Sequence, residues 1–450
     1  MKVAIVIQRY GADINGGAEL HARYVAERLS THVDVRVLTT CARNYVTWAN
    51  EFPPGTESVN GIPVERFPVA RPRDLADFGL QSQRVFGRVH TMQEELDWLD
   101  SQGPVSPSLI SRLRRSEDEF DFVLLFCVRY YQTYYAARAA AERAVLVPTA
   151  EREPALGIRI FEPIFRGVRG IMYNSAEERA CINAVSGNHD VPGVVVGVGS
   201  VIPPAVEPSR ARQQFGLHDR YVVYVGRIDA NKGCVQLFDS FIRYLERPWR
   251  AIDLVLIGQG DLPIPRHPRI RHLGYVSDED KFDVIAGSEA LVMPSPYESL
   301  SMAALESWAL GRPVLANAHC DVLLGQCLRS NGGLYYAHSG EFEAVLDRLL
   351  DDPELGNRLG EHGRSYFTRH YSWSVIERKY LDMFEGLKFR PVSRRMEPMP
   401  GWLARQRANV PPAIDVVAGL PSGAVRGEAE DEKHGRNGAG APVARLEAHA

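Results

Sequence analysis

The sequence is poor in cysteine and has no paired cysteine motif. Its six cysteines are scattered over 450 residues, and none forms a Cys-x-x-Cys pair. The nearest approach to a cluster is His319 with Cys320 and Cys327, whose spacing fits no zinc pattern. We therefore predict no metal site and no disulfide framework, and we expect the reduced thiols of a cytoplasmic protein.

The sequence also lacks long hydrophobic runs and an excess of charge. No apolar run reaches the roughly 20 residues that a membrane-spanning helix needs, and no hydrophobic leader with a cleavage site precedes the first apolar segment. A net charge of −4 gives no general attraction for nucleic acid, so we predict no nucleic-acid partner. With 45% hydrophobic and 24% charged residues, the composition is that of a soluble globular protein long enough for two domains.

The N-terminal half alternates apolar runs with helical spacing. Val3–Ile7 is a continuous apolar run, which is typical of a parallel strand buried on both faces. A glycine-containing loop, a helical pattern at Ala18–Leu29 and a second strand at Val33–Leu38 complete a βαβ opening. The alternation continues to about residue 200, and it predicts a first α/β domain over residues 1–200.

This opening lacks the signature of a dinucleotide site. Gly11, Gly16 and Gly17 do not form G-x-G-x-x-G, and Thr39-Thr40 stands where an acid would hold the ribose of NAD. The pattern therefore disfavours an NAD-dependent dehydrogenase. Gly16-Gly17 at a helix start still allows the backbone to approach a phosphate or a sugar, although a plain tight turn explains these glycines equally well.

Tyrosines follow a further buried strand, Phe122–Cys127. Tyr130 is the first of four, and such a group either lines an acceptor cleft or, more often, packs in the core with its hydroxyls satisfied. We also predict a short strand and four helices in this half, at residues Val64–Phe67, Gln81–Leu99, Ser108–Glu119, Ala136–Arg143 and Ile158–Phe165.

The second half repeats the α/β pattern after a short linker at 201–205. Its first strand is predicted at Tyr221–Val225, and the domain extends over residues 201–373. A closing helix follows within residues 374–390. The tail, 391–450, is rich in Pro, Gly, Ala, Arg and Glu; we predict that it is mostly disordered, with a short docked segment at 400–404. Two similar domains joined by a linker imply a cleft between them.

The most informative stretch of this second domain is residues 294–313. A predicted strand is followed by a polar turn, by Glu298, by Ser299-Leu300-Ser301 and by a helix that carries Glu306. A helix N-terminus after a strand is an anion site, because its unpaired N–H groups point outward. Carboxylates beside it are suited to sugar hydroxyls, which donate hydrogen bonds to them. The alternative is a capping acid with a solvated helix acid.

Cations and glycines are expected at the same edge of the second sheet. Arg227 and Lys232 flank the turn after the first strand, and together with the helix N-terminus they would hold a diphosphate from two sides. Gly258 and Gly260 would let a loop pass close to a bulky ligand. Residues 275–277 follow the next strand and could meet a nucleobase through their main chain.

Four motifs in this order resemble those of the family 4 glycosyltransferases, which have the GT-B fold. The resemblance covers about residues 1–388 and rests on Gly16-Gly17-Ala18-Glu19, on Gly226-Arg227 with Lys232-Gly233, on Gly258-Gln259-Gly260, and on Glu298 to Glu306 as an E-x7-E motif. It implies an α/β fold of two Rossmann-like domains facing across a cleft. It further implies retaining, metal-independent transfer of a hexose from a nucleotide-diphosphate sugar, with no cofactor beyond that donor.

The resemblance also implies roles for the residues. Arg227 and Lys232 would bind the donor diphosphate and Glu298 the donor sugar, and these three are the predicted catalytic residues. Glu306 would hold the ribose hydroxyls. The other implied donor contacts are Gly16, Gly17, Gly258, Tyr275, Val276, Ser299, Leu300 and Ser301. Glu151 and Tyr130 are the residues predicted to position the acceptor or the sugar.

One departure from the family leaves alternatives open. The family often carries a histidine in the cleft, and Glu151 within Val147–Glu153 stands at its place. A catalytically weak sugar-nucleotide-binding or scaffold protein in glycan assembly is therefore an alternative, as is a GT-B enzyme of another reaction type, such as an epimerase or a glycogen-type synthase. The expected acceptor is a glycan, a lipid-linked glycan or a small hydroxyl compound. The resemblance implies peripheral association with the inner face of the cytoplasmic membrane.

Overall fold

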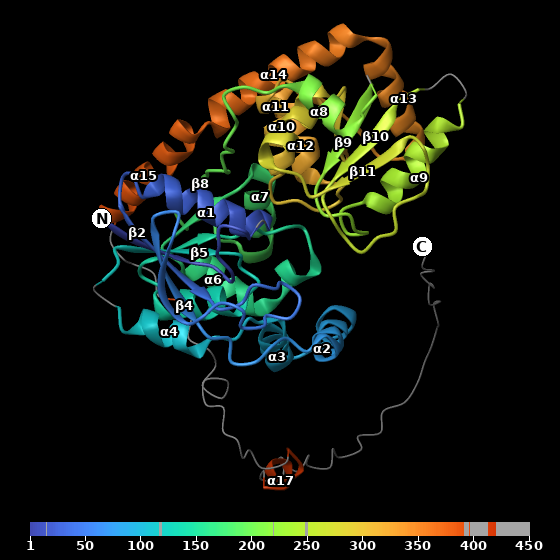
Figure 1. The fold of residues 1–450 in the computed structure, drawn as a ribbon. Coiled ribbons are helices and arrows are strands. Elements are labelled where there is room, and N and C mark those ends of the chain that lie inside the picture. The colour runs from blue at the N-terminus through green and yellow to red at the C-terminus, as the bar shows by residue number, and fades with distance from the viewer. Residues whose placement is uncertain are drawn as a thin grey trace, which may run out of the picture. The chain divides into compact units, whose positions relative to one another are not determined.

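The computed structural model describes residues 1–14, 16–116, 119–218, 220–247, 251–390, 396 and 413–419 (Figure 1). The chain divides into two compact units, Met1–Glu397 and Pro398–Ala450. The described part of the second unit contains one helix, α17 (Ala413–Ala418). The docked segment predicted at 400–404 lies outside the described residues, as does most of the tail.

The first sheet of unit 1 has, among the described residues, eight strands in the order β3-β4-β2-β1-β5-β6-β7-β8. All of its neighbouring strands are parallel except β3 and β4. Val3 to Ile7 is fully buried, as expected for an apolar run between two helical layers. The other strands that position the site are β1 (Lys2–Val6), β2 (Asp34–Thr40), β5 (Phe122–Phe126), β6 (Ala144–Val147), β7 (Gly170–Tyr173) and β8 (Gly193–Val195).

The edge of this sheet is an antiparallel hairpin of β3 (Gly55–Val59) and β4 (Ile62–Phe67), of which we predicted only the second strand. The two turn residues are Asn60 and Gly61, with φ values of 51° and 83°. An Asn-Gly pair is the strongest short signal for a hairpin because both positions need positive φ. The signal was therefore present in the sequence.

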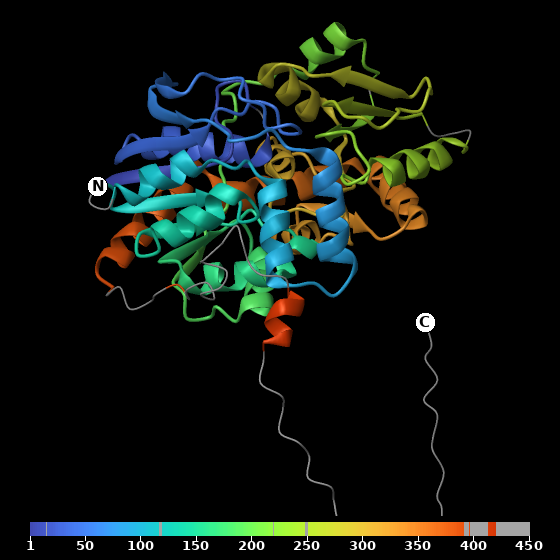
Figure 2. The ribbon, with the colours of Figure 1, turned by 90° about the horizontal axis from the view of Figure 1, so that it is seen from below.

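The helix predicted at Gln81–Leu99 is two helices. They are α2 (Leu75–Gly87) and α3 (Met92–Gln102), which lie side by side in Figures 1 and 2. The break is set by Thr91, whose side chain accepts a hydrogen bond from the backbone N–H of Glu94, while the Glu94 side chain accepts one from the N–H of Thr91. This reciprocal capping starts a new helix where the periodicity alone suggested continuity.

Three more predicted helices have different bounds. The helix predicted at Ala136–Arg143 is α5 (Tyr131–Ala139). It begins among the tyrosines because burial of their rings overrides their modest helix propensity, and it ends before Arg143. The segment predicted at Ile158–Phe165 contains a 3₁₀ turn followed by a short helix with Pro163 in its first turn, and another 3₁₀ turn precedes the segment. The elements concerned are α4 (Pro107–Arg114), η1 (Pro154–Gly157), η2 (Arg159–Phe161) and α6 (Glu162–Gly167).

The second sheet is parallel among the described strands, in the order β11-β10-β9-β12-β13-β14. We did not predict β14, α8 or α12. The strands are β9 (Tyr221–Val225), β10 (Asp253–Ile257), β11 (Ile270–Gly274), β12 (Ala290–Met293), β13 (Val314–Asn317) and β14 (Gly333–Tyr336). The helices around it include α8 (Pro208–Phe215), α9 (Cys234–Leu245), α10 (Asp278–Gly287), α11 (Met302–Ala309), α12 (Asp321–Ser330) and α13 (Ser339–Asp351).

The last two helices of unit 1 return to the first sheet. Figure 1 shows α14 (Pro353–Tyr371) leading from the second sheet to α15 (Trp373–Lys388), which lies next to α1 (Gly17–Leu29). The rings of Phe384 and Phe122 stack at 5.0 Å, and the guanidinium of Arg28 lies over the Trp373 ring. The first sheet is thus covered in part by residues that are about 260 positions away in the sequence.

We expect Phe384→Ala to lower the free energy of unfolding by roughly 3–5 kcal/mol, because it removes a fully buried ring from this contact. Phe389, one residue past α15 and 88% exposed, is the matched control, and its change to alanine should stay within about 0.5 kcal/mol. Urea denaturation followed by tryptophan fluorescence measures both. Equal effects of the two substitutions would contradict the packing role of α15.

Candidate functional site

A cavity of about 1440 Å³ lies between the two sheets and is lined by residues of both. One wall comes from the segments that follow β1, β5, β6 and β7, and the other from those that follow β9, β10, β11 and β12. Parallel strands present their carboxyl ends at one edge of a sheet, where α/β proteins bind their ligands. The fold therefore brings two such edges to a single cavity.

The segment at 294–313 has the predicted order of strand, polar turn and helix. Ser301 is the N-cap of α11, and its Oγ accepts a hydrogen bond from the N–H of Ala304 at 3.2 Å. Ser299, Leu300 and Ser301 all line the cavity, directly before the helix N-terminus. Gly311 follows the helix with φ of 70°, a conformation that favours glycine.

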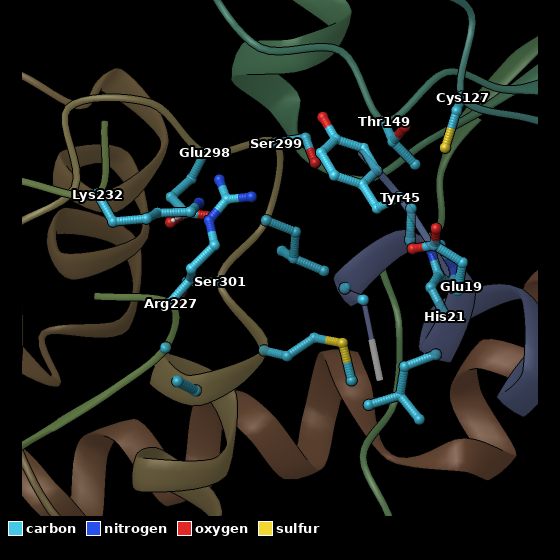
Figure 3. Close-up of a pocket in the computed structure, with 18 of the residues that line it drawn as sticks. Glu19, His21, Tyr45, Cys127, Thr149, Arg227, Lys232, Glu298, Ser299 and Ser301 are labelled. Atoms are coloured by element: carbon cyan, nitrogen blue, oxygen red, sulfur yellow. Dashed lines mark hydrogen bonds and ion pairs between the residues drawn. The ribbon is translucent and has the colours of Figure 1, made fainter. Parts of the chain in front are cut away.

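Two of the three predicted catalytic residues, Lys232 and Glu298, are in direct contact. Lys232, from the loop after β9, places its Nζ 2.8 Å from Oε1 of Glu298 (Figure 3). Burial lowers the pKa of Lys232, but the carboxylates of Glu298 and Glu151 more than offset this, so its pKa lies above the usual value. The cation is therefore charged at any physiological pH. A bound diphosphate would have to compete with Glu298 for it.

Arg227 lies on the same wall and is more accessible. Its Nε forms an ion pair with Asp229, and its side chain is about half exposed. Figure 3 shows Arg227, Lys232 and Glu298 grouped together, across the cavity from Glu19, His21 and Cys127. This wall thus carries two cations beside the α11 N-terminus, an arrangement that can neutralise a doubly charged ligand.

Gly258 and Gly260 lie where neighbouring loops come into close contact. A Cβ on Gly258 would lie 2.0 Å from the carbonyl oxygen of Gly226, and one on Gly260 would lie 1.9 Å from that of Ile228. Gly258 also has φ of 129°. Both positions line the cavity, but their missing side chains make room for the backbone of the neighbouring loop.

Glu306 is buried and already has two partners. Its Oε1 accepts hydrogen bonds from Oγ of Ser200, at 2.8 Å, and from Nζ of Lys281, at 3.1 Å. Burial lowers the pKa of Lys281, and Glu306 together with Asp278 raises it above its usual value. Sequence reasoning missed Lys281 and Ser200. Of these two, only Lys281 could have been found from the sequence, because it is a cation on the helix that follows the predicted base-binding loop.

Tyr275 and Val276 follow β11 and line the cavity, as predicted. Tyr275 is 70% exposed, so its ring is accessible to a ligand. Val276 is half-buried against the core. The two residues thus share the lining of the cavity with Lys281 and Glu306.

The glycines of the opposite wall differ from one another. Gly16 is the N-cap of α1, and a Cβ there would lie 2.2 Å from Oε2 of Glu19, whereas Gly17 has open space around it. Glu19 is buried and accepts hydrogen bonds from Nε2 of Gln8, at 3.1 Å, and Nε of Arg9, at 2.9 Å. Of the two glycines, only Gly16 has a neighbour that a side chain would meet, the carboxylate of Glu19. Glu19 joins α1 to the segment after β1 through its hydrogen bonds with Gln8 and Arg9.

Tyr130 lines the cavity but is almost fully buried. Its ring packs edge-on against Trp48 at 5.7 Å, and the guanidinium of Arg129 lies over it. Burial raises the pKa of the Tyr130 hydroxyl well above its usual value, so the hydroxyl stays protonated. Of the two readings that we considered for the tyrosines, packing in the core accounts for most of this ring.

Glu151 follows β6, and its carboxyl group interacts electrostatically with Lys232 and Glu298. Burial raises its pKa to about 7; Lys232 opposes this shift, and Glu298 adds to it. Glu153, two residues on, is paired with Arg129 at 2.7 Å. At neutral pH the Glu151 carboxyl is therefore close to half protonated and can donate as well as accept a hydrogen bond.

No group of three or more His, Cys, Asp or Glu side chains suited to a metal ion occurs among the described residues. Within the same part of the chain, no helix has the length and apolar character that crossing a membrane requires.

Comparisons with known proteins agree with this architecture. Residues 219–352 match the family model described as "Glycosyl transferases group 1". The chain is 26% identical to a mannosylfructose-phosphate synthase of Agrobacterium fabrum in an alignment of 246 residues that covers 45% of this chain and 51% of the relative. It is 33% identical to an alpha-D-kanosaminyltransferase of Streptomyces kanamyceticus in an alignment of 182 residues that covers 36% of this chain and 45% of the relative. The chain thus spans about half the length of these relatives.

Solved structures resemble the whole of the two-domain unit. A sucrose-phosphate synthase from Thermosynechococcus elongatus matches with a TM-score of 0.63 and 16% identity, over 86% of this chain and 99% of that one. Anabaena Alr3699/HepE in complex with UDP-glucose matches with a TM-score of 0.62 and 16% identity, over 86% of this chain and 100% of that one. The chain has the GT-B fold, and its residues 219–352 match the model of the group 1 glycosyltransferases.

Proposed function

We propose that the protein is a glycosyltransferase that moves a hexose from a nucleotide-diphosphate sugar to an acceptor hydroxyl. The observation that carries this proposal is the grouping of Lys232, Arg227 and Glu298 beside the N-terminus of α11, in a cavity between two sheet edges. The relatives are named as synthases and transferases of sugars, and one similar structure contains UDP-glucose. These names support the same reaction class.

The donor would bind mainly to the second domain. Its diphosphate replaces Glu298 as the partner of Lys232, and the N–H groups of residues 299–301 add hydrogen bonds to it. Glu298, released from the ion pair, accepts hydrogen bonds from the donor sugar. The ribose hydroxyls donate hydrogen bonds to Oε2 of Glu306, because Ser200 and Lys281 contact only Oε1. The base lies near Tyr275 and Val276. The cations then stabilise the negative charge that the leaving diphosphate gains.

We assign residues 1–200 to the acceptor side, 201–373 to the donor side and 374–390 to the closing helix. The acceptor is a glycan, a lipid-linked glycan or a small hydroxyl compound, selected by loops such as residues 41–80. The resemblance to family 4 supports a cytoplasmic protein that works at the inner face of the cytoplasmic membrane.

A second candidate is a protein that binds sugar nucleotides with little turnover. The observation that favours it is Glu151, a second acid facing Glu298 across the cavity. Two carboxylates near one sugar repel each other when both are ionised. Binding of a donor without transfer to any acceptor in a cell extract would support this candidate.

Donor binding is the first test. In a thermal-shift panel of UDP-, GDP- and ADP-hexoses, we expect one nucleotide to stabilise the protein by about 2.7 kcal/mol at 100 times its dissociation constant. Lys232→Ala should abolish most of this shift. It should also raise the activation free energy of sugar transfer by roughly 2–4 kcal/mol.

Lys388→Ala is the matched control, because Lys388 is an exposed lysine at the end of α15 and does not line the cavity. It should leave the shift and the turnover unchanged. Normal turnover of Lys232→Ala would refute the diphosphate assignment.

Retention of the donor's anomeric configuration is expected, by front-face attack in which the leaving phosphate oxygen accepts the acceptor proton. The anomeric coupling constant of the product, read by NMR before mutarotation, measures it. Inversion would remove the protein from the retaining enzymes. A product epimerised at another carbon, with no new glycosidic bond, would indicate an epimerase instead.

Glu151 predicts a pH dependence of stability. Its folded pKa of about 7 lies above the ordinary 4.5, so between these values unfolding releases a proton and the free energy of unfolding falls as pH rises. The loss is nearly complete by about pH 8 and amounts to roughly 3 kcal/mol. Glu151→Gln lacks this titration, so it should gain stability relative to wild type from pH 5 to 8 in urea titrations. A constant difference across this range would contradict the assigned pKa.

A further inference from the structure

Two loops of the first domain face residues 298 and 299 across the cavity. The loop after β6 carries Glu151, whose charge interacts with Lys232 and Glu298. The end of β7 carries Asn174, whose Nδ2 lies 3.4 Å from Oγ of Ser299. Both residues line the cavity, and they come from neighbouring strands of one sheet. They therefore form one continuous wall opposite the predicted donor-sugar contact.

Asn174 has an unused acceptor on this wall. The residue is only 3% exposed, and its Oδ1 is buried without a hydrogen-bond partner among the described residues. A buried carbonyl oxygen with no partner is costly, and such atoms are uncommon in folded proteins. Asn174 lines the cavity, and a rotation of its side-chain amide would bring this oxygen to a ligand hydroxyl, which is a suitable donor for it.

Glu178 fixes the positions of both loops. It is 2% exposed; one carboxyl oxygen accepts a hydrogen bond from the N–H of Ala150, at 2.6 Å, and the other from the N–H of Asn174, at 2.5 Å. Ala150 directly precedes Glu151. A single buried carboxyl group thus holds the backbone on which Glu151 is carried and the backbone of Asn174 itself.

This arrangement departs from ordinary helix capping. Ser175 is the N-cap of α7 (Ala176–Ser186) and accepts a hydrogen bond from the N–H of Glu178, as in a capping box. In that motif the acid would return to the N–H of the N-cap residue. Here it reaches the preceding residue and a loop 28 positions away. Thr149, next to Ala150, has φ of 48°, so the loop adopts a conformation that a branched residue rarely takes.

We propose that Asn174 and Glu151 form a hydroxyl-binding wall for the transferred sugar, and that Glu178 is the positioning residue that holds this wall against residues 298 and 299. The inference rests on the proposed function, because it names the part of the donor that the wall meets. Asn174 accepts a hydrogen bond from a sugar hydroxyl through Oδ1. Glu178 touches no substrate and acts through the two backbone N–H groups.

Hydrogen exchange tests the positioning role without any ligand. In Glu178→Gln the amide nitrogen faces one of the two N–H groups, so we expect the amides of Ala150 and Asn174 to exchange at least tenfold faster than in the wild type. Glu95→Gln is the matched control: Glu95 is equally buried and accepts a hydrogen bond from the N–H of Ile160, but it does not line the cavity. Unchanged exchange at Ala150 and Asn174 in Glu178→Gln, or equal acceleration in both variants, would overturn the positioning role.

The ratio of UDP-glucose to UDP affinity, measured by calorimetry, tests the sugar contact. Asn174→Ala should weaken UDP-glucose about tenfold and leave UDP within twofold, because only the sugar meets this wall. Glu178→Gln should change the ratio in the same direction. Asn188→Ala is the control: Asn188 is as buried as Asn174 and also has an unpartnered Oδ1 in the described structure, but it does not line the cavity.

The outcomes separate the two proposals. Equal losses for UDP and UDP-glucose in Asn174→Ala, or no loss for either, would overturn the sugar contact while leaving donor binding intact. If the wild type binds no member of the UDP, GDP and ADP panel, the proposed function and the sugar contact fail together. The exchange experiment still decides whether Glu178 positions the two loops.

Discussion

The ion pair between Lys232 and Glu298 is the interaction around which the cavity is arranged. Two opposite charges at 2.8 Å in a largely buried site reduce the cost of removing each of them from water. The same solution recurs at Lys281 with Glu306 and at Arg9 with Glu19. Each pair joins residues from different elements, so the charges that would serve chemistry also fix the relative positions of loops and helices.

A ligand entering such a site exchanges partners. A diphosphate offers Lys232 two negative charges in place of the single one of Glu298, and the carboxylate it displaces meets hydroxyl groups that only a sugar brings. Binding is then strongest when the diphosphate and the sugar of a nucleotide sugar are both present. Free phosphate would remove the cation from Glu298 and leave that acid without a donor. This asymmetry is a physical basis for discrimination between a nucleotide sugar and simpler anions.

Much of this arrangement was predictable because it depends on local patterns. The apolar runs predicted the buried strands, and the sequence at 294–313 placed Glu298 just before a helix N-terminus and Glu306 within that helix. Contacts between distant segments were not predictable from local pattern. Lys281, Ser200 and Glu178 meet the site only after the sheets form, and no periodicity marks them. Gly258 and Gly260 were assigned to the cavity correctly, but their steric reason lies in carbonyl groups about 30 residues away in sequence. The Asn60-Gly61 turn is the opposite case: the Asn-Gly pair is a local signal for a hairpin, but we did not predict the hairpin from it.

The stacking of Phe384 on Phe122 has a consequence for biosynthesis. The ribosome delivers the first sheet early, but the ring that covers Phe122 belongs to a helix made about 260 residues later. At 5–20 residues per second, the nascent first domain waits roughly 13–50 seconds with that apolar face uncovered. A fragment ending near residue 200 would keep this face exposed permanently. The unit that reaches its final packing on its own is therefore the whole of the two-sheet chain through α15, even though each sheet is continuous in sequence.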